Sequence, residues 1–175
     1  RKWSASETTR HLTVAVNVSA RQFNQNDFVK ELAAIIARTG ADPARLKLEL
    51  TESLLIEDID DIVLRMQQIK AQGISLSLDD FGTGFSSLSC LKRLPLDQIK
   101  VDQAFVRDLV IDPDDETIVQ AIVTMGRILG LDVIAEGVET IAQRDRLREY
   151  GCLRYQGYLF APPLAPDEFE RFLCG

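Results

Sequence analysis

Two adjacent aspartates, Asp79 and Asp80, stand in the segment SLSLDDFGTG (75–84), between an alternating apolar run and a glycine-rich turn. Neighbouring carboxylates repel each other unless a positive charge lies between them. Carboxylate oxygens are also the ligands that hard divalent cations prefer. The pair therefore predicts a site where one carboxylate bridges two cations and its neighbour holds the second. Paired cations of this kind suit in-line displacement at phosphorus.

Polar side chains in similar positions follow the other alternating runs of the sequence. The six runs are TVAVNVS (13–19), LKLELTE (46–52), SLSLDD (75–80), QIKVD (98–102), DVIAEG (132–137) and LRYQGY (153–158). Successive strand residues face opposite ways, so each run places a polar side chain near its C-terminal end, on the face that its large aliphatic residues mostly avoid. The polar residues at the C-terminal ends of the runs are Asn17, Glu49, Asp79, Asp80, Lys100, Asp102, Glu136 and Gln156. A single glutamate at a strand end is usually a solvated rim residue, but matching positions on six strands favour one shared site.

Stretches with apolar residues at helical spacing separate these runs, at 26–40, 58–73, 86–95, 112–130 and 140–151. Strand alternating with helix predicts an α/β fold with a parallel sheet. A doubly wound sheet is apolar on both faces, whereas a barrel gathers its active site at the carboxyl ends of its strands. The pattern favours a TIM-like (β/α)8 barrel, with an open six-stranded sheet as the alternative. Six runs are present, so we expect about two strands to be missing upstream of Arg1.

Composition limits the classes of function. The chain has 175 residues, 46% of them hydrophobic, and a net charge of −7, which indicates one globular domain and disfavours a nucleic-acid polymer as partner. A small phosphorylated ligand held through a metal stays compatible with this charge. No apolar run is long enough to span a membrane, and three scattered cysteines fit a reducing cytoplasm better than a disulfide framework. The single histidine, His11, precedes the first run, so Ser-His-Asp chemistry has no support.

A phosphorelay receiver also places an acidic pair and a lysine at strand ends. That class would leave the ELTE (49–52) and AEGVE (135–139) segments unexplained, and we disfavour it.

Six motifs in order, NVSARQF, ELTES, DDFGTGFSSL, IKVD, AEGVET and QGYLF, resemble the EAL domain family of bacterial cyclic di-GMP phosphodiesterases. The resemblance covers essentially the whole chain. It implies a (β/α)8-type barrel with one antiparallel strand. It also implies hydrolysis of cyclic di-GMP to linear pGpG with one or two Mg²⁺ or Mn²⁺ ions.

The resemblance implies roles for the polar residues at the strand ends. Asn17, Glu49 and Asp79 correspond to ligands of one metal, and Asp79 would bridge to a second metal held by Asp80 and Glu136. A one-metal and a two-metal mechanism both stay open at this point.

The remaining site residues are assigned in the same way. Lys100 would contact the hydrolytic water, and Glu136 is the preferred general base if one metal is bound. Asp102 and Gln156 resemble residues that line the substrate. Glu52 and Glu139 resemble residues that support the ligands, with Glu52 anchoring the loop after Asp80.

The Glu-Ala-Leu motif that names the family is absent, and it belongs upstream of TVAVNVS. We therefore expect residues 1–175 to be an EAL domain incomplete at its N-terminus. Two functions stay open: a cytoplasmic phosphodiesterase, or a catalytically inactive cyclic di-GMP receptor. We expect fusion to sensory or GGDEF domains, a homodimer as one form, and no membrane contact from this segment.

Overall fold

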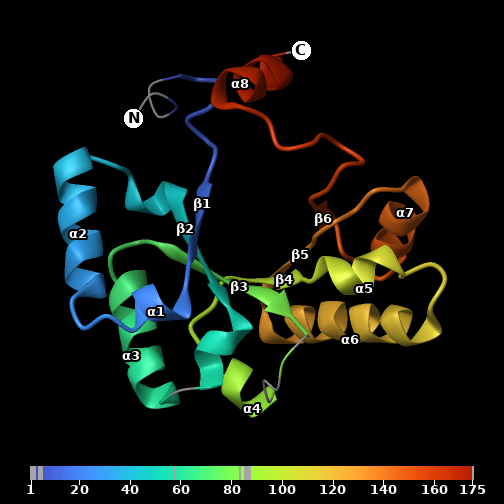
Figure 1. Ribbon diagram of the computed structural model, residues 1–175, viewed down its shortest axis with the longest axis horizontal. Coiled ribbons are helices and arrows are strands. Elements are labelled where there is room, and N and C mark those ends of the chain that lie inside the picture. Colours follow the sequence, from blue (N-terminus) through green and yellow to red (C-terminus); the bar gives the residue numbers. More distant parts are fainter. Residues whose placement is uncertain (1–2, 4–5, 57, 83, 85–87, 175) are drawn as a thin grey trace.

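Strands and helices alternate along the chain in the computed structural model, which describes residues 3, 6–56, 58–82, 84 and 88–174 (Figure 1). The strands are β1 (Val14–Val18), β2 (Leu46–Thr51), β3 (Ser75–Phe81), β4 (Gln98–Val101), β5 (Asp132–Ala135) and β6 (Arg154–Tyr155). Each corresponds to one of the six predicted runs, and β6 is much shorter than its run. All neighbouring strands pair in parallel, in the order in which they occur in the chain.

Helices connect the strands. The α-helices are α1 (Ala20–Phe23), α2 (Phe28–Thr39), α3 (Ile59–Lys70), α4 (Leu88–Leu91), α5 (Gln103–Arg107), α6 (Pro113–Leu129), α7 (Ile141–Glu149) and α8 (Pro166–Cys174), and the 3-10 helices are η2 (Pro43–Arg45) and η3 (Glu52–Ile56). Local sequence sets the ends of the longest one, α6. The Asp112 side chain accepts a hydrogen bond from the Asp114 amide, Pro113 occupies the first turn, and Gly130 ends the helix in the left-handed conformation.

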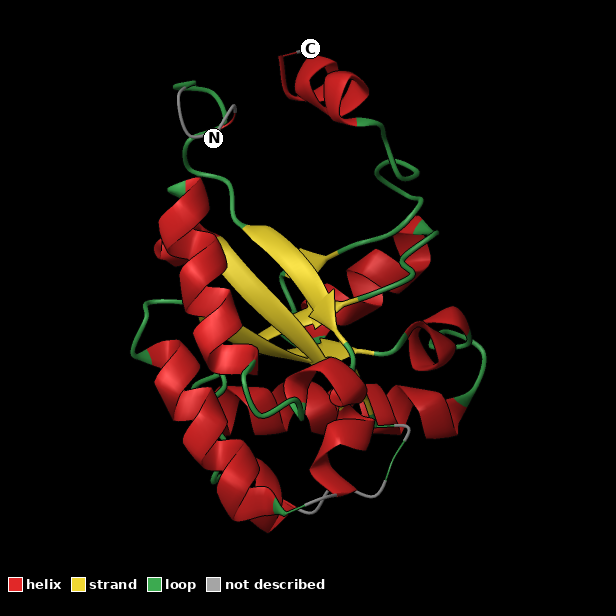
Figure 2. Ribbon diagram, turned by 60° about the vertical axis from the view of Figure 1, so that its left-hand side comes forward, coloured by secondary structure: helices red, strands yellow, loops and turns green. Residues whose placement is uncertain are grey.

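The strand order distinguishes two architectures. In a doubly wound sheet the order reverses at a switch point, whereas here every strand lies beside its predecessor and the winding never changes direction. Figure 2 shows most of the helices gathered around one side of the curved sheet, with the C-terminal helix α8 standing apart. The chain is thus an α/β protein of the TIM-barrel type. Among the described residues, β1 pairs only with β2 and β6 only with β5.

The core lies between the outer face of the sheet and the helices. Leu50, Leu76 and Ile99 on that face are at most 1% exposed. α6 approaches β4 and β5 so closely that a Cβ at Gly126 would lie 2.3 Å from Val133 Cγ2. The edge strand differs, since Val16 of β1 is 43% exposed.

The N-terminal segment and α8 lie near each other above the sheet (Figure 1). The Trp3 indole Nε1 donates a hydrogen bond to Glu170 Oε1 at 2.7 Å, and its ring centroid lies 5.5 Å from that of Phe169. Within the described ranges, no helix combines the length and apolar character that crossing a membrane requires.

Candidate active site

A break in the regular pairing of β3 with β4 delivers both aspartates to the same place. Ser77 pairs with Gln98 and Leu78 with Ile99, but the next pair is Phe81 with Val101, so β3 carries one extra residue. Asp80 has φ 55° and is the one residue other than glycine with positive φ in the described part of the chain. This bulge lets adjacent side chains approach one centre, which a regular strand would send to opposite faces.

Lys100 lies at the middle of the site. Its Nζ is 3.0 Å from Glu49 Oε2, 2.9 Å from Asp79 Oδ1 and 2.8 Å from Glu136 Oε1. The lysine side chain is 6% exposed and the three carboxylate side chains are 12–17% exposed. Glu49, Asp79 and Lys100 come from β2, β3 and β4. Glu136 directly follows β5, and its amide donates a hydrogen bond to the Val101 carbonyl of β4 at 3.1 Å.

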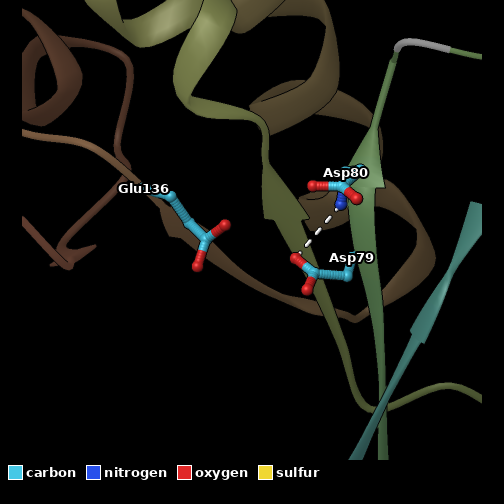
Figure 3. Close-up of side chains that lie close together, drawn as sticks. All are labelled: Asp79, Asp80 and Glu136. Carbon is cyan, nitrogen blue, oxygen red and sulfur yellow. Dashed lines mark hydrogen bonds between the residues drawn. The ribbon is translucent and has the colours of Figure 1, made fainter. Parts of the chain in front are cut away.

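Three carboxylates form a group with metal-ligand spacing. One oxygen each of Asp79, Asp80 and Glu136 lies within 4.8 Å of the other two. Figure 3 shows Asp79 and Asp80 side by side on β3, with Glu136 facing them from the segment after β5. The Asp80 amide donates to Asp79 Oδ1 at 3.1 Å. The structure thus brings together the three residues that the sequence assigned to a second metal.

Burial and crowded charge shift the pKa values of these groups. Burial raises the pKa of Glu136 above its usual value, and the nearby Lys100 ammonium only partly opposes this. Burial also raises the pKa of Asp80, with further increases from Asp79 and Asp102. Burial lowers the pKa of Lys100, but hydrogen bonds to Glu136, Asp79 and Glu49 more than offset this, and the net shift is upward. The lysine is therefore a fixed cation at neutral pH.

The first predicted metal set is less completely assembled than the second. Asn17 of β1 pairs in register with Glu49 of β2, so both lie on the inner face, yet Asn17 is exposed. Glu49 contacts Lys100. One member of the set, Asp79, also belongs to the second group.

The residues predicted to support the ligands have distinct contacts. Glu52 Oε2 accepts hydrogen bonds from the amides of Gly82 (3.2 Å) and Gly84 (3.1 Å), in the loop after β3. Residues 83 and 85–87 of the same motif lie outside the described residues. Asp102 Oδ1 accepts from the Ala104 amide and caps α5.

A cavity of about 610 Å³ opens beside the carboxylates. Asp80, Glu136, Glu139 and Gln156 supply polar groups to its wall. Among the described lining residues, Gln103 is the one further polar side chain apart from the Tyr158 hydroxyl. The rest of the wall consists of aromatic and aliphatic side chains, prolines and glycines, and it includes Phe172. A wall of this kind suits a flat, partly apolar ligand that carries charge at one end.

Sequence reasoning missed two features of the site. The cavity wall formed by α8 and the preceding prolines carried no signal that linked it to the strand ends. The bulge at Asp80 was also missed, although two adjacent polar residues before a Phe-Gly turn are consistent with a strand that changes its facing.

Comparison with known proteins identifies the class. Residues 1–163 match the EAL domain family, and the chain belongs to that family. It is 43% identical over 155 residues to the bifunctional diguanylate cyclase/cyclic di-GMP phosphodiesterase MucR of Pseudomonas aeruginosa. This match covers 89% of this chain and 23% of MucR. The chain is 44% identical over 162 residues to the cyclic di-GMP phosphodiesterase NbdA of the same organism, covering 93% of this chain and 21% of NbdA. The chain thus spans less than a quarter of the length of these two relatives.

Solved structures share the fold. The EAL domain of Mycobacterium smegmatis DcpA superposes with a TM-score of 0.92 at 36% identity, over 99% of this chain and 78% of that one. The MucR phosphodiesterase in complex with c-di-GMP superposes with a TM-score of 0.86 at 43% identity. The match covers 90% of this chain and 64% of that one. A manganese and cyclic di-GMP complex of Klebsiella pneumoniae BlrP1 superposes with a TM-score of 0.78 at 34% identity. The match covers 86% of this chain and 39% of that one. A calcium complex of BlrP1 has the same TM-score, identity and coverage.

Proposed function

We propose that this chain forms most of the catalytic EAL domain of a phosphodiesterase that hydrolyses cyclic di-GMP to linear pGpG. The observation that carries the proposal is the arrangement of Lys100 among Glu49, Asp79 and Glu136 at the strand ends, beside an open cavity. Family membership and the cyclic di-GMP complexes of related structures support it.

We infer that the site takes Mg²⁺ or Mn²⁺. The donor set is carboxylate oxygen, with Asn17 as an amide oxygen beside Glu49, and such hard donors fit these ions. The carboxylates around Lys100 carry more negative charge than one ammonium neutralises, which leaves a demand for further cations. Asp79, Asp80 and Glu136 would hold one ion, and Asn17, Glu49 and Asp79 another. When bound, the metal supplies Lewis acidity toward the scissile phosphate and lowers the pKa of water.

The chain's own residues have separable tasks. Lys100 Nζ can donate a hydrogen bond to the attacking water or to a phosphate oxygen, because a protonated lysine donates three. If one metal is bound, Glu136 can accept the proton of the water at its carboxylate. Gln156 and Glu139 face the cavity, where their polar groups suit hydrogen bonding to a guanine. Asp102 lies near Asp80 and supports its orientation. Glu52 holds the loop after Asp80 through two amides.

We further propose that residues upstream of Arg1 complete the barrel beside β1 and supply the glutamate of the Glu-Ala-Leu motif. Among the described residues β1 pairs only with β2, and Val14 and Val16 are exposed, which supports this. The match covers 78% of the DcpA chain, so that domain contains further residues that have no counterpart in this chain. Sensory or GGDEF domains would then lie elsewhere in the parent protein, consistent with the length of MucR and NbdA.

A homodimer and a cytoplasmic location belong to the same proposal. Leu88 on α4 and Ile128 on α6 are 65% and 76% exposed and line one apolar groove, which supports self-association. The three cysteines lie far apart in the sequence, which fits a reducing compartment better than a disulfide framework. Analytical ultracentrifugation of the full-length protein with Ile128→Asp tests the dimer, and a shift to monomer is expected.

The test of the activity uses the full-length protein with cyclic di-GMP, chelator and added Mg²⁺ or Mn²⁺, and chromatography of the products. Accumulation of pGpG that stops with chelator and resumes with metal is expected. Tight binding of cyclic di-GMP without turnover under any metal would contradict the proposal and favour a receptor.

A further inference from the structure

A second layer of polar side chains lies one step below the site, on the same inner face. Lys47, Ser77 and Gln98 each precede a site residue by two positions, namely Glu49, Asp79 and Lys100, and residues two apart on a strand share a face. We call Lys47, Ser77 and Gln98 the lower cluster. Gln98 Oε1 accepts hydrogen bonds from Lys47 Nζ at 3.0 Å and from Ser77 Oγ at 3.2 Å.

The lower cluster repeats the geometry of the site with its direction reversed. In the site, Lys100 of β4 reaches across β3 to Glu49 of β2. In the lower cluster, Lys47 of β2 reaches across β3 to Gln98 of β4. Because an ammonium can only donate, the Gln98 carbonyl oxygen must face Lys47, and this fixes the orientation of the amide. Two crossed lysine contacts therefore join the same three strands at successive levels.

The lower cluster also lies at the last regular pairs before the bulge. Ser77 pairs with Gln98 in the backbone register, and their side chains are hydrogen-bonded to each other. One pair later the register shifts, and the extra residue brings Asp79 and Asp80 to the site. The hydrogen-bonded Ser77–Gln98 pair, which precedes the bulge, therefore limits the bulge to the part of β3 that carries Asp79 and Asp80.

Stability alone does not account for this layer. Barrel interiors are commonly filled by branched aliphatic residues, and a buried polar cluster is often no more stabilising than an apolar replacement. Ser77 is fully buried and Gln98 is 5% exposed.

We propose that Gln98 is a positioning residue for the reaction: it ties β2 and β3 to β4 so that Lys100 contacts Glu49 and Asp79 at once. The inference rests on the proposed phosphodiesterase activity. It concerns how the site is held, because Gln98 does not line the cavity beside the carboxylates.

The test compares Gln98→Leu with Gln98→Glu in the full-length protein. Gln98→Leu removes the acceptor, and we expect kcat for cyclic di-GMP to fall about tenfold to a hundredfold, the cost usually seen for residues that orient ligands. KM should change less than kcat, and the melting temperature should stay the same or rise. Gln98→Glu keeps an oxygen acceptor for Lys47 and Ser77, so it should retain most of the wild-type kcat. Gln67→Leu, at an exposed glutamine of α3, is the matched control.

Several outcomes would overturn the inference. The first is a wild-type kcat in Gln98→Leu. The second is a fall in kcat in Gln98→Glu as large as that in Gln98→Leu. The third is a fall in kcat that is fully explained by a lower melting temperature. If Gln98→Leu does not fold, Ser77→Ala removes one of the two hydrogen bonds and should lower kcat by a smaller factor. An unchanged kcat in that variant would equally contradict the inference.

A readout without turnover separates this inference from the proposed function. In a crystal structure of Gln98→Leu, we expect Lys100 Nζ to lose contact with Glu49 or Asp79. Retention of both contacts would overturn the inference even if the wild-type protein proved inactive. Conversely, an inactive wild-type protein and an inactive Gln67→Leu control would count against the proposed function alone.

Discussion

The outer and inner faces of the sheet are built from the same strands and have opposite chemistry. On β2 and β4, Leu50 and Val101 face the helices and are at most 1% exposed. Their neighbours Glu49 and Lys100 face the other way and form an ion pair at 3.0 Å. The outer face gains free energy by removing apolar surface from water. The inner face concentrates like charges, which costs stability and creates a demand for cations. The difference separates substitutions that should unfold the protein from those that should only inactivate it.

Asp79→Asn should give the largest effect on activity. Asp79 belongs to both proposed metal sets and contacts Lys100, and a neutral amide cannot replace its charge. We expect kcat to fall by about 10³-fold, since a metal contributes several kcal/mol to such reactions. Hydrolysis assays on the full-length variant check this, with the exposed Asp27→Asn as control. Near-normal turnover in Asp79→Asn would remove this residue from the metal site.

Leu76→Ala tests the outer face in the same strand. Leu76 is fully buried, and its replacement should lower the free energy of unfolding by about 3 kcal/mol. The folded enzyme should keep its kcat, because the side chain faces away from the site. Urea denaturation and kinetics measure the two quantities, with Leu64→Ala at a 53% exposed position of α3 as control. A large loss of kcat without loss of stability would mean that the two faces are not separable.

Lys100→Ala should have a smaller catalytic effect than Asp79→Asn. Its ammonium offers hydrogen bonds to the attacking water, so we expect kcat to fall about 10²-fold, as when one aimed donor is removed from an active site. KM should rise less than kcat falls. Steady-state kinetics across substrate concentrations distinguish this from weakened binding at unchanged kcat, which would assign Lys100 to phosphate anchoring.

Asp80→Asn should have the smallest effect on stability, and of opposite sign to Leu76→Ala. The pKa of Asp80 is raised in the fold, so the folded state holds its proton more tightly than the unfolded chain does. Stability from this group is present at low pH and is lost as pH rises from its ordinary value near 3.8 through the raised pKa. Without metal, Asp80→Asn should therefore be more stable than the wild type above that range, and asparagine tolerates the left-handed conformation. Thermal melts in chelator between pH 3 and pH 7 test this, and a less stable variant at pH 7 would contradict it.

Alternation in the sequence was enough to predict the six strands and the inner face, because a period of two residues assigns each side chain to one side. It placed Glu49, Asp79 and Lys100 on one surface, where the structure brings them into contact. Alternation alone sends Asp80 to the opposite face. The adjacent acidic pair and the family resemblance predicted that Asp80 joins the site, but not the bulge that brings it there. Nor could alternation predict the pairing of Lys47 with Gln98, residues 51 positions apart, because that contact depends on the register of three strands.

A crystal structure of the full-length protein grown with Mn²⁺, with anomalous differences recorded near the manganese edge, would show whether these carboxylates hold metal. We expect a manganese peak within bonding distance of Asp79, Asp80 and Glu136. We also expect that Asp79→Asn loses this peak. A wild-type map with no manganese at these carboxylates, from crystals of protein that hydrolyses cyclic di-GMP with Mn²⁺, would contradict this expectation.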